Sequence, residues 1–374
     1  MLRAGKRNAV KRLLWLDVAR GLAILWVVYF HFFMTYFPPA EWGALLAGGG
    51  DLAQVTWLKI SKLGYHAVGL FIILSGWALM ESTSRRAASG PIKWSAWYIA
   101  RLIRLYPVYW AAHLVYLISP FVARLEPVDS RIILSLLGLR FIDISRNFNY
   151  LNAAWWYFSL LIQLVLMFPL LFWVARRMNP WVFLLLASTV GFFARYMLLI
   201  VYPQNGAWLV GGLALCRLPE FALGMTLGTL YSQSPERADK FFLGGAGLLT
   251  GLILYPLALE LYANCFTYIF VDCATGVCCL LVVVGLAGPL CRLPTPAKAI
   301  AVVGAYSYGI FLIHQPYVIW LGLRIREQPV WMFLLIAIAT LASLSALGVA
   351  LEKAINAIVN RFTKGRTKPA PRTA

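Results

Sequence analysis

Three polar side chains near the start of the chain lie in one long apolar run, and their spacing could support chemistry. The stretch LDVARGLAILWVVYFHFF, residues 16–33, carries Asp17, Arg20 and His31. In a helix, Arg20 and His31 share a face and lie about 16 Å apart along the axis, and Asp17 can pair with Arg20. Histidine can act as a base or a nucleophile, and arginine can hold an anion. Alternatively, Asp17 and Arg20 only mark the membrane interface.

A pair of arginines lies at the start of a later apolar run. Arg101 and Arg104, in ARLIRLYPVYW, are three residues apart and share a helix face. Two guanidinium groups on one face can hold phosphate groups through paired hydrogen bonds. Arginines are also common where a span meets the cytoplasm, so the pair could instead be a topological marker.

Other ionisable groups also fall inside apolar runs. Arg217 and Glu220, in RLPEFALGMTLG, are spaced to form an ion pair, and Arg195 in another run could join them. A salt bridge that only joins helices is the alternative to a functional role. His314 lies in SYGIFLIHQPYVIW, and Asp272 lies in a run where the sequence indicates no partner for it. Ionisable groups are costly in hydrocarbon, so each is a candidate for function.

The composition indicates which elements must position these side chains. Of 374 residues, 61% are hydrophobic and 13% are charged, and the mean hydropathy is +0.75. Soluble domains have about 45–50% apolar and about 25% charged residues, so we predict an all-α polytopic membrane protein. A span needs about 20 apolar residues. Such runs predict about ten transmembrane helices, at 13–37, 60–80, 100–122, 154–175, 181–202, 207–231, 241–261, 265–288, 299–321 and 330–352.

The distribution of positive charge predicts the topology. The net charge is +19, and Lys and Arg gather in alternate loops, as cytoplasmic loops do. Both termini are therefore expected in the cytoplasm, and nucleic acid is not an expected partner. We predict a basic cytoplasmic N-terminus at 1–12, a transmembrane domain at 13–356 and a basic, disordered cytoplasmic tail at 357–374.

The segment 123–153 is the longest loop expected on the outer side. Its stretch IILSLLGL is too short to span a membrane and could form an interfacial or re-entrant helix. No Cys or His spacing typical of a metal site is present in the chain, so no metal is expected.

Five motifs together resemble the acyltransferase-3 family of integral membrane acyltransferases. They are LDVARGLAILWVVYFHF, GLFIILSGWALM, RLIRLYPVYW, RLPEFALGMTLG and SYGIFLIHQP, in the order in which the family has them. The chain departs from the family at WYFSLLIQ, where many members have two acidic residues. Leu161 and Ile162 stand at those positions, so only Gln163 of that motif remains.

The resemblance implies transfer of an acyl group, most commonly acetyl, from cytoplasmic acyl-CoA to a hydroxyl of an envelope polysaccharide or lipid-linked sugar. It implies a multi-pass protein of the bacterial cytoplasmic (inner) membrane. The donor phosphates would bind Arg101 and Arg104, and His31 would act as a general base or carry the acyl group briefly. Asp17 and Arg20 would line the route of the donor, and Arg20 would orient it. Arg217 and Glu220 would hold a facing helix, and His314 would assist from the acceptor side.

Some members carry a fused extracytoplasmic esterase-like domain, which we do not expect in this chain. The acyl group would then pass directly to the acceptor or to a separate extracytoplasmic partner. The rival hypothesis is a transporter or flippase for a glycan or lipid, since intramembrane Arg, Glu and His also suit proton relays. A non-catalytic membrane scaffold or sensor is a third hypothesis, and it does not explain why Arg20 and His31 share a face.

Overall fold

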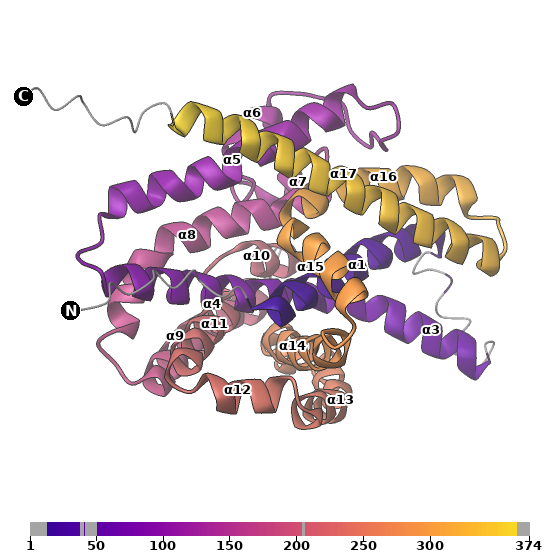
Figure 1. Ribbon diagram of the computed structural model, residues 1–374. Helices are drawn as coiled ribbons and strands as arrows, with labels where there is room; N and C mark the ends of the chain where they lie inside the picture. Colours follow the sequence, from indigo (N-terminus) through magenta and orange to yellow (C-terminus); the bar gives the residue numbers. More distant parts are fainter. Residues whose placement is uncertain (1–12, 38–40, 42–50, 204–205, 365–374) are drawn as a thin grey trace, which may run out of the picture.

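The computed structural model describes residues 13–37, 41, 51–203 and 206–364. These residues form a bundle of helices, and no strand occurs among them (Figure 1). The α-helices are α1 Leu14–Tyr36, α3 Leu52–Lys62, α4 Ala67–Ala87, α5 Trp94–Ile118, α6 Arg131–Leu137, α7 Ile144–Asn147, α8 Trp156–Ala175, α9 Pro180–Tyr196, α10 Gly206–Gly212, α11 Leu218–Gln233, α12 Pro235–Phe242, α13 Gly245–Glu260, α14 Val271–Leu290, α15 Pro294–Ala305, α16 Ser307–Ile325 and α17 Val330–Lys364. Short 3₁₀ or π elements are η2 Leu63–His66, η3 Ala153–Trp155, η4 Met197–Val201 and η5 Thr267–Ile269. The all-α prediction is confirmed for this part of the chain.

Helix α1 lies at the centre of the bundle, in indigo in Figure 1, and contacts α4, α14, α15 and α16. Its polar residues are therefore surrounded by other helices. Asp17 is buried, and Arg20 and His31 are half-buried. This is where ionisable groups of a membrane helix are expected, because the bundle interior offers them polar partners.

Six helical segments among the described residues are long and apolar enough to cross a membrane, and there are up to eight if each of two bent pairs counts as one span. The pairs are α12 with α13, bent by 54°, and α15 with α16, bent by 78°. Two predicted spans have no counterpart in this set. Helix α5 is long but carries Arg101 and Arg104, and α11 has only 16 residues. The total of ten and the cytoplasmic position of the termini stay predictions.

Large apolar side chains cover much of the outer surface of the bundle. They include Leu166 and Leu170 on α8, Leu185 and Phe193 on α9, Leu252 and Leu257 on α13, and Leu335 and Ile338 on α17. A water-soluble monomer rarely exposes apolar patches of this extent, whereas hydrocarbon solvates them. Together with the long apolar helices, this surface indicates a multi-pass integral membrane protein.

Glycines allow the central helices to approach closely. A Cβ atom on Gly224 of α11 would collide with the Ile73 carbonyl of α4, and one on Gly304 of α15 would collide with the Asp17 carbonyl of α1. Small residues at such contacts are typical of membrane helix pairs, where close packing replaces the hydrophobic effect. The second contact fixes α15 against the turn of α1 that carries Asp17.

The last helix is longer than predicted. Helix α17 continues to Lys364, so residues 357–364, expected as part of a disordered tail, are helical. Apolar residues at Ile355, Ile358 and Phe362 continue the helical spacing past the end of the predicted span. The remainder of that tail, 365–374, and the basic N-terminus, 1–12, lie outside the described residues.

Candidate active site

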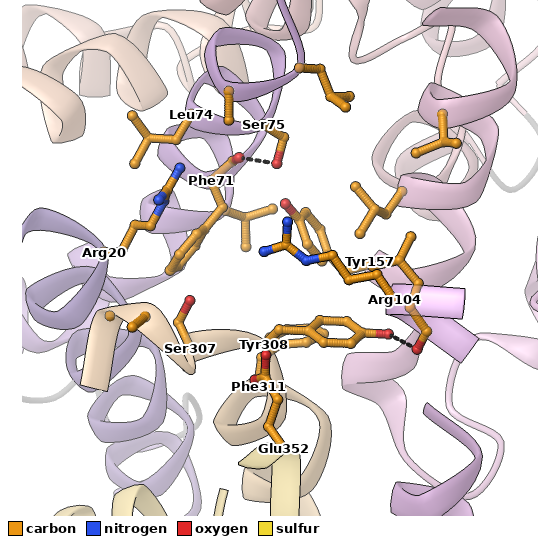
Figure 2. A pocket seen from close by; sticks show the side chains of 18 of the residues that line it. Arg20, Phe71, Leu74, Ser75, Arg104, Tyr157, Ser307, Tyr308, Phe311 and Glu352 are labelled. Carbon is orange, nitrogen blue, oxygen red and sulfur yellow. Dashed lines mark hydrogen bonds between the residues drawn. The ribbon is translucent and has the colours of Figure 1, made fainter. Parts of the chain in front are cut away.

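A cavity of about 300 Å³ lies between α1, α4, α5, α8, the end of α15, α16 and α17. Figure 2 shows Arg20 of α1 on one side of it and the Arg104 side chain reaching its centre from the other, beside Tyr157 of α8. Arg101 also lines the cavity. Three of the side chains predicted from the sequence as candidates thus meet in one hollow, although they come from two different helices.

The two arginines of α5 are differently held. Arg101 donates a hydrogen bond to the Ser82 hydroxyl (3.2 Å) and lies over the Trp97 ring, 5.3 Å from its centroid. Arg104 is exposed and forms no hydrogen bond or ion pair with any residue in the described part of the chain. Its guanidinium group is therefore available to an anion that enters the cavity.

Glu352 of α17 lines the same cavity and is buried. Its Oε2 accepts a hydrogen bond from the backbone N–H of Gly309 (2.8 Å), in the first turn of α16. That N–H has no acceptor within its own helix, so a neighbouring helix caps it. Glu352 was not among the residues predicted from the sequence. The available signal was that Glu352 is the one acidic side chain between positions 330 and 364.

His31 and His314 form a pair close to the cavity, although neither is among the described residues that line it. Val27 of α1 and Phe311 of α16 line the cavity, and each histidine lies about one helical turn farther along its helix. The His314 Nε2 atom is 3.3 Å from His31 Nδ1, and the two rings meet edge to face with centroids 5.0 Å apart. The two residues are 283 positions apart in the chain.

Backbone carbonyls determine which nitrogen of each neutral imidazole carries the hydrogen. The Phe311 carbonyl lies 2.7 Å from His314 Nδ1 and can only accept, so Nδ1 donates and Nε2 of His314 keeps its lone pair. His31 Nδ1 faces that lone pair and the Val27 carbonyl (2.9 Å), both of them acceptors. His31 Nδ1 must therefore carry hydrogen, which leaves a lone pair on His31 Nε2. This nitrogen can take a proton or attack a carbonyl carbon.

Asp17 and Arg20 lie where the sequence predicts them to pair. Arg20 Nη1 is 3.5 Å from Asp17 Oδ1. Arg20 lines the cavity, whereas Asp17 is buried against α15 and is not among the described lining residues. The geometry places Arg20 at the cavity wall and Asp17 behind it.

Glu220 belongs to a buried charge network. Arg217 Nη2 lies 3.0 Å from Glu220 Oε1, and Arg217 Nη1 lies 2.6 Å from Asp272 Oδ2. Arg195 Nη1 lies 2.8 Å from the same Asp272 oxygen. The predicted pair is thus present and Arg195 does join it, and Asp272 has two partners although the sequence indicated none. The network joins α9, α11 and α14, and Glu220 is not among the described residues that line the cavity. Its catalytic role stays a prediction.

The motif WYFSLLIQ, in which the chain departs from the family pattern, lies on α8 beside the cavity. Leu161 lines the cavity, so an apolar side chain occupies that part of the wall. Gln163 Nε2 donates to the Gly212 carbonyl (2.9 Å), and its Oε1 accepts from the Ala214 N–H (3.2 Å). Gln163 therefore holds the irregular connection between α10 and α11.

The segment between α5 and α8 packs onto α16 around Pro316, which lies inside this helix. Pro316 has no N–H, so the Leu312 carbonyl one turn earlier lacks its helical donor. Trp155 Nε1 (2.8 Å) and Asn152 Nδ2 (3.0 Å) donate to that carbonyl instead. The Ala123 N–H donates to the Pro316 carbonyl (3.1 Å). Hydrogen bonds from the segment between α5 and α8 thus hold the carbonyls of Leu312 and Pro316, which come two residues before and two residues after His314.

The stretch IILSLLGL in this segment, predicted as a short helix, does form one, α6.

A family model described as an acyltransferase domain matches residues 13–349. The chain belongs to the acyltransferase-3 family. The matched range contains every predicted site residue, from Asp17 to His314, whereas Glu352 lies just beyond it. Comparisons with curated proteins and with solved structures found no match. The chain is therefore a membrane acyltransferase, and the cavity, together with the paired histidines beside it, is its candidate active site.

Proposed function

We propose that this acyltransferase moves an acetyl group from cytoplasmic acetyl-CoA to a hydroxyl of an envelope polysaccharide or lipid-linked sugar. The observation that carries the proposal is the cavity, which the arginines of α5 line together with Val27 and Phe311, residues about one helical turn before His31 and His314. The protein would lie in a bacterial cytoplasmic membrane with both termini inside, so that the arginine side of the cavity faces the donor. The acceptor, or a separate extracytoplasmic partner, would approach from the other side.

We expect the donor to bind along the cavity in one direction, with its phosphates at the arginines of α5 and its thioester toward the histidine pair. The phosphates of coenzyme A would bind Arg101 and Arg104, because guanidinium groups bind phosphate through paired hydrogen bonds. Its long, thin pantetheine arm would pass Arg20 and Tyr157 toward Phe311. The thioester carbon would then lie near the histidine pair.

In the transfer step, His31 Nε2 takes the proton from the acceptor hydroxyl as the oxygen attacks the thioester carbonyl carbon. The C–S bond breaks, an ester forms, and the coenzyme A thiolate leaves with the proton that His31 held. In the alternative sequence, His31 Nε2 attacks the thioester carbonyl carbon and the C–S bond breaks, so that the coenzyme A thiolate leaves. The acceptor oxygen then attacks the acetyl carbon on His31, the C–N bond breaks as the ester forms, and the hydroxyl proton goes to the thiolate. Both sequences need the lone pair that the tautomer assignment leaves on this nitrogen.

The test uses membranes that contain the wild-type chain, His31→Ala, or His66→Ala as a matched control. His66 is also a buried histidine, held between the hydroxyls of Tyr255 (3.0 Å) and Tyr262 (3.1 Å), and it does not line the described cavity. Labelled acetyl-CoA should mark envelope glycans with the wild-type and His66→Ala proteins and not with His31→Ala. Label that persists in His31→Ala would refute the assigned role.

A second pair of assays separates the proposal from transport. Succinyl-CoA in place of acetyl-CoA tests the identity of the acyl group. A donor-free assay of glycan or lipid translocation tests the transporter hypothesis, which requires movement without coenzyme A. Translocation without any labelled product would favour that hypothesis over acetyl transfer.

A further inference from the structure

A second, shallow hollow of about 750 Å³ lies outside the active-site cavity. Residues between 87 and 94, at the connection from α4 to α5, form one wall, and the end of α8 with the turn that follows it forms the other, from Phe172 to Arg177. Of the described residues that line it, two are arginines and none is acidic. No part of the proposed acetyl transfer uses this hollow.

Both arginines keep their positive charge uncompensated. Arg177 lies over the Trp173 ring, 3.9 Å from the centroid, and donates to the Trp173 carbonyl (3.3 Å). Arg176 lies over the Phe172 ring at 5.6 Å. Neither forms an ion pair with a carboxylate in the described part of the chain, and both are exposed. Two adjacent guanidinium groups fixed on aromatic rings can hold a phosphate group.

An apolar stripe leads along α8 to this hollow. Leu166, Leu170 and Trp173 follow helical spacing on α8, so they share one face, and Arg177 lies in the turn just past the end of this helix. The exposed fractions of the first three are 59%, 64% and 54%. This stripe offers apolar contacts to acyl chains, and tryptophan is enriched where a span meets the lipid headgroups. A soluble phosphate compound would contact the arginines and gain nothing from the stripe.

We propose that this hollow binds the headgroup of an anionic phospholipid, with its phosphate on Arg176 and Arg177 and its acyl chains along Leu166, Leu170 and Trp173. Basic pockets between spans on the cytoplasmic side bind anionic headgroups in this way. The proposal uses a different surface from the acetyl transfer, so either can fail alone.

The chain offers a closely matched control for the test. Arg324 lies over the Trp320 ring at 3.8 Å and donates to the Trp320 carbonyl (2.8 Å), as Arg177 does with Trp173. Arg324 does not line the described hollow. Arg177→Gln and Arg324→Gln therefore remove the same local contacts and the same charge. Both side chains are exposed, so each variant should fold.

The experiment titrates the purified full chain in detergent with phosphatidylglycerol or phosphatidylcholine and counts bound lipid by native mass spectrometry. Phosphatidylglycerol should bind the wild-type protein more tightly than phosphatidylcholine. Arg177→Gln should weaken phosphatidylglycerol binding by about fivefold, the equivalent of about 1 kcal/mol for one arginine near a membrane surface. Arg324→Gln should leave it unchanged.

Three results would overturn the proposal. Equal binding of the two lipids would remove the role of the anionic headgroup. Equal loss in Arg177→Gln and Arg324→Gln would show a general effect of charge. Displacement of the lipid by glycerol 3-phosphate at the same concentration would show a site for soluble phosphate that does not use the apolar stripe.

Discussion

Replacement of His314 by leucine tests the role of the histidine pair directly. In the proposed transfer His31 would become an imidazolium, and its Nδ1–H would then need an acceptor. His314 Nε2, at 3.3 Å, is one of the two acceptors, and the Val27 carbonyl at 2.9 Å is the other. His314→Leu removes the first and leaves the second. His314 is therefore a positioning residue that acts through His31.

The size of the effect follows from the geometry. A hydrogen bond to a charged group contributes about 1.5–3 kcal/mol. The 3.3 Å separation exceeds the usual N–H···O distance and the Val27 carbonyl still accepts, so the lower end applies. About 1.4 kcal/mol is a tenfold change in rate, so kcat should fall about tenfold. The KM for acetyl-CoA should stay near its wild-type value, because the α5 arginines are untouched.

The assay measures initial rates of labelled acetyl transfer in membranes at several acetyl-CoA concentrations. His314→Gln should recover most of the loss, because its amide oxygen can accept from His31 Nδ1. His66→Leu serves as the control for loss of a buried histidine. If His314→Leu and His314→Gln have equal rates, or if only KM changes, the hydrogen bond between the histidines has no part in the reaction.

Three other substitutions test the donor site, the helix contact and the charge network. Arg104→Ala should raise the KM for acetyl-CoA by about tenfold with little change in kcat, since it removes one charged phosphate contact; an unchanged KM in steady-state rates would exclude the contact. Gly304→Ala places a methyl group against the Asp17 carbonyl and should cost about 1–3 kcal/mol of unfolding free energy. In thermal unfolding, Gly211→Ala, whose Cβ would meet no atom within 4 Å, should be near neutral. Asp272→Asn leaves two buried arginines short of a carboxylate and should destabilise by about 3–5 kcal/mol; an unaltered unfolding midpoint would contradict this.

Local spacing along one helix was predictable from the sequence. The repeat of 3.6 residues per turn is enough to predict three features: Arg20 and His31 share a helix face, Asp17 pairs with Arg20, and the two arginines of α5 share a face. Composition was enough to predict an all-helical membrane protein. These properties need no knowledge of which helices are neighbours.

Contacts between distant helices were not predictable in the same way. Nothing near His31 in the sequence indicates that its partner is His314, and nothing near Asp272 indicates Arg195 and Arg217. Only the packing of α1 on α16, and of α14 beside α9 and α11, creates these pairs. Glu352 was missed for the same reason, since its role depends on Gly309 of another helix.

The number of spans was difficult to predict because hydropathy does not show where a helix breaks. Residues 299–321 read as one run, yet α15 and α16 meet there at 78°. Likewise, residues 207–231 read as one span, yet residues 213–217 interrupt the helix before α11. Such breaks are tolerated in membranes only where other groups satisfy the freed backbone atoms.

The start of α16 shows how those atoms are satisfied and what the arrangement achieves. Glu352 accepts from the Gly309 N–H after the bend. Trp155 and Asn152 donate to the Leu312 carbonyl that Pro316 leaves free. The short helical stretch between the bend and the proline is therefore held at both ends by side chains from other segments.

That stretch presents Tyr308, Phe311 and His314 at spacings of three residues, which place them along one side of the helix. Tyr308 and Phe311 line the cavity, and His314 meets His31 beyond them. The Tyr308 hydroxyl also donates to the Leu105 carbonyl of α5 (2.9 Å). The bend, the glycine and the proline of SYGIFLIHQP thus have one structural result: they fix His314 one turn beyond the cavity-lining Phe311, where backbone carbonyls of its own helix and His31 are its polar partners.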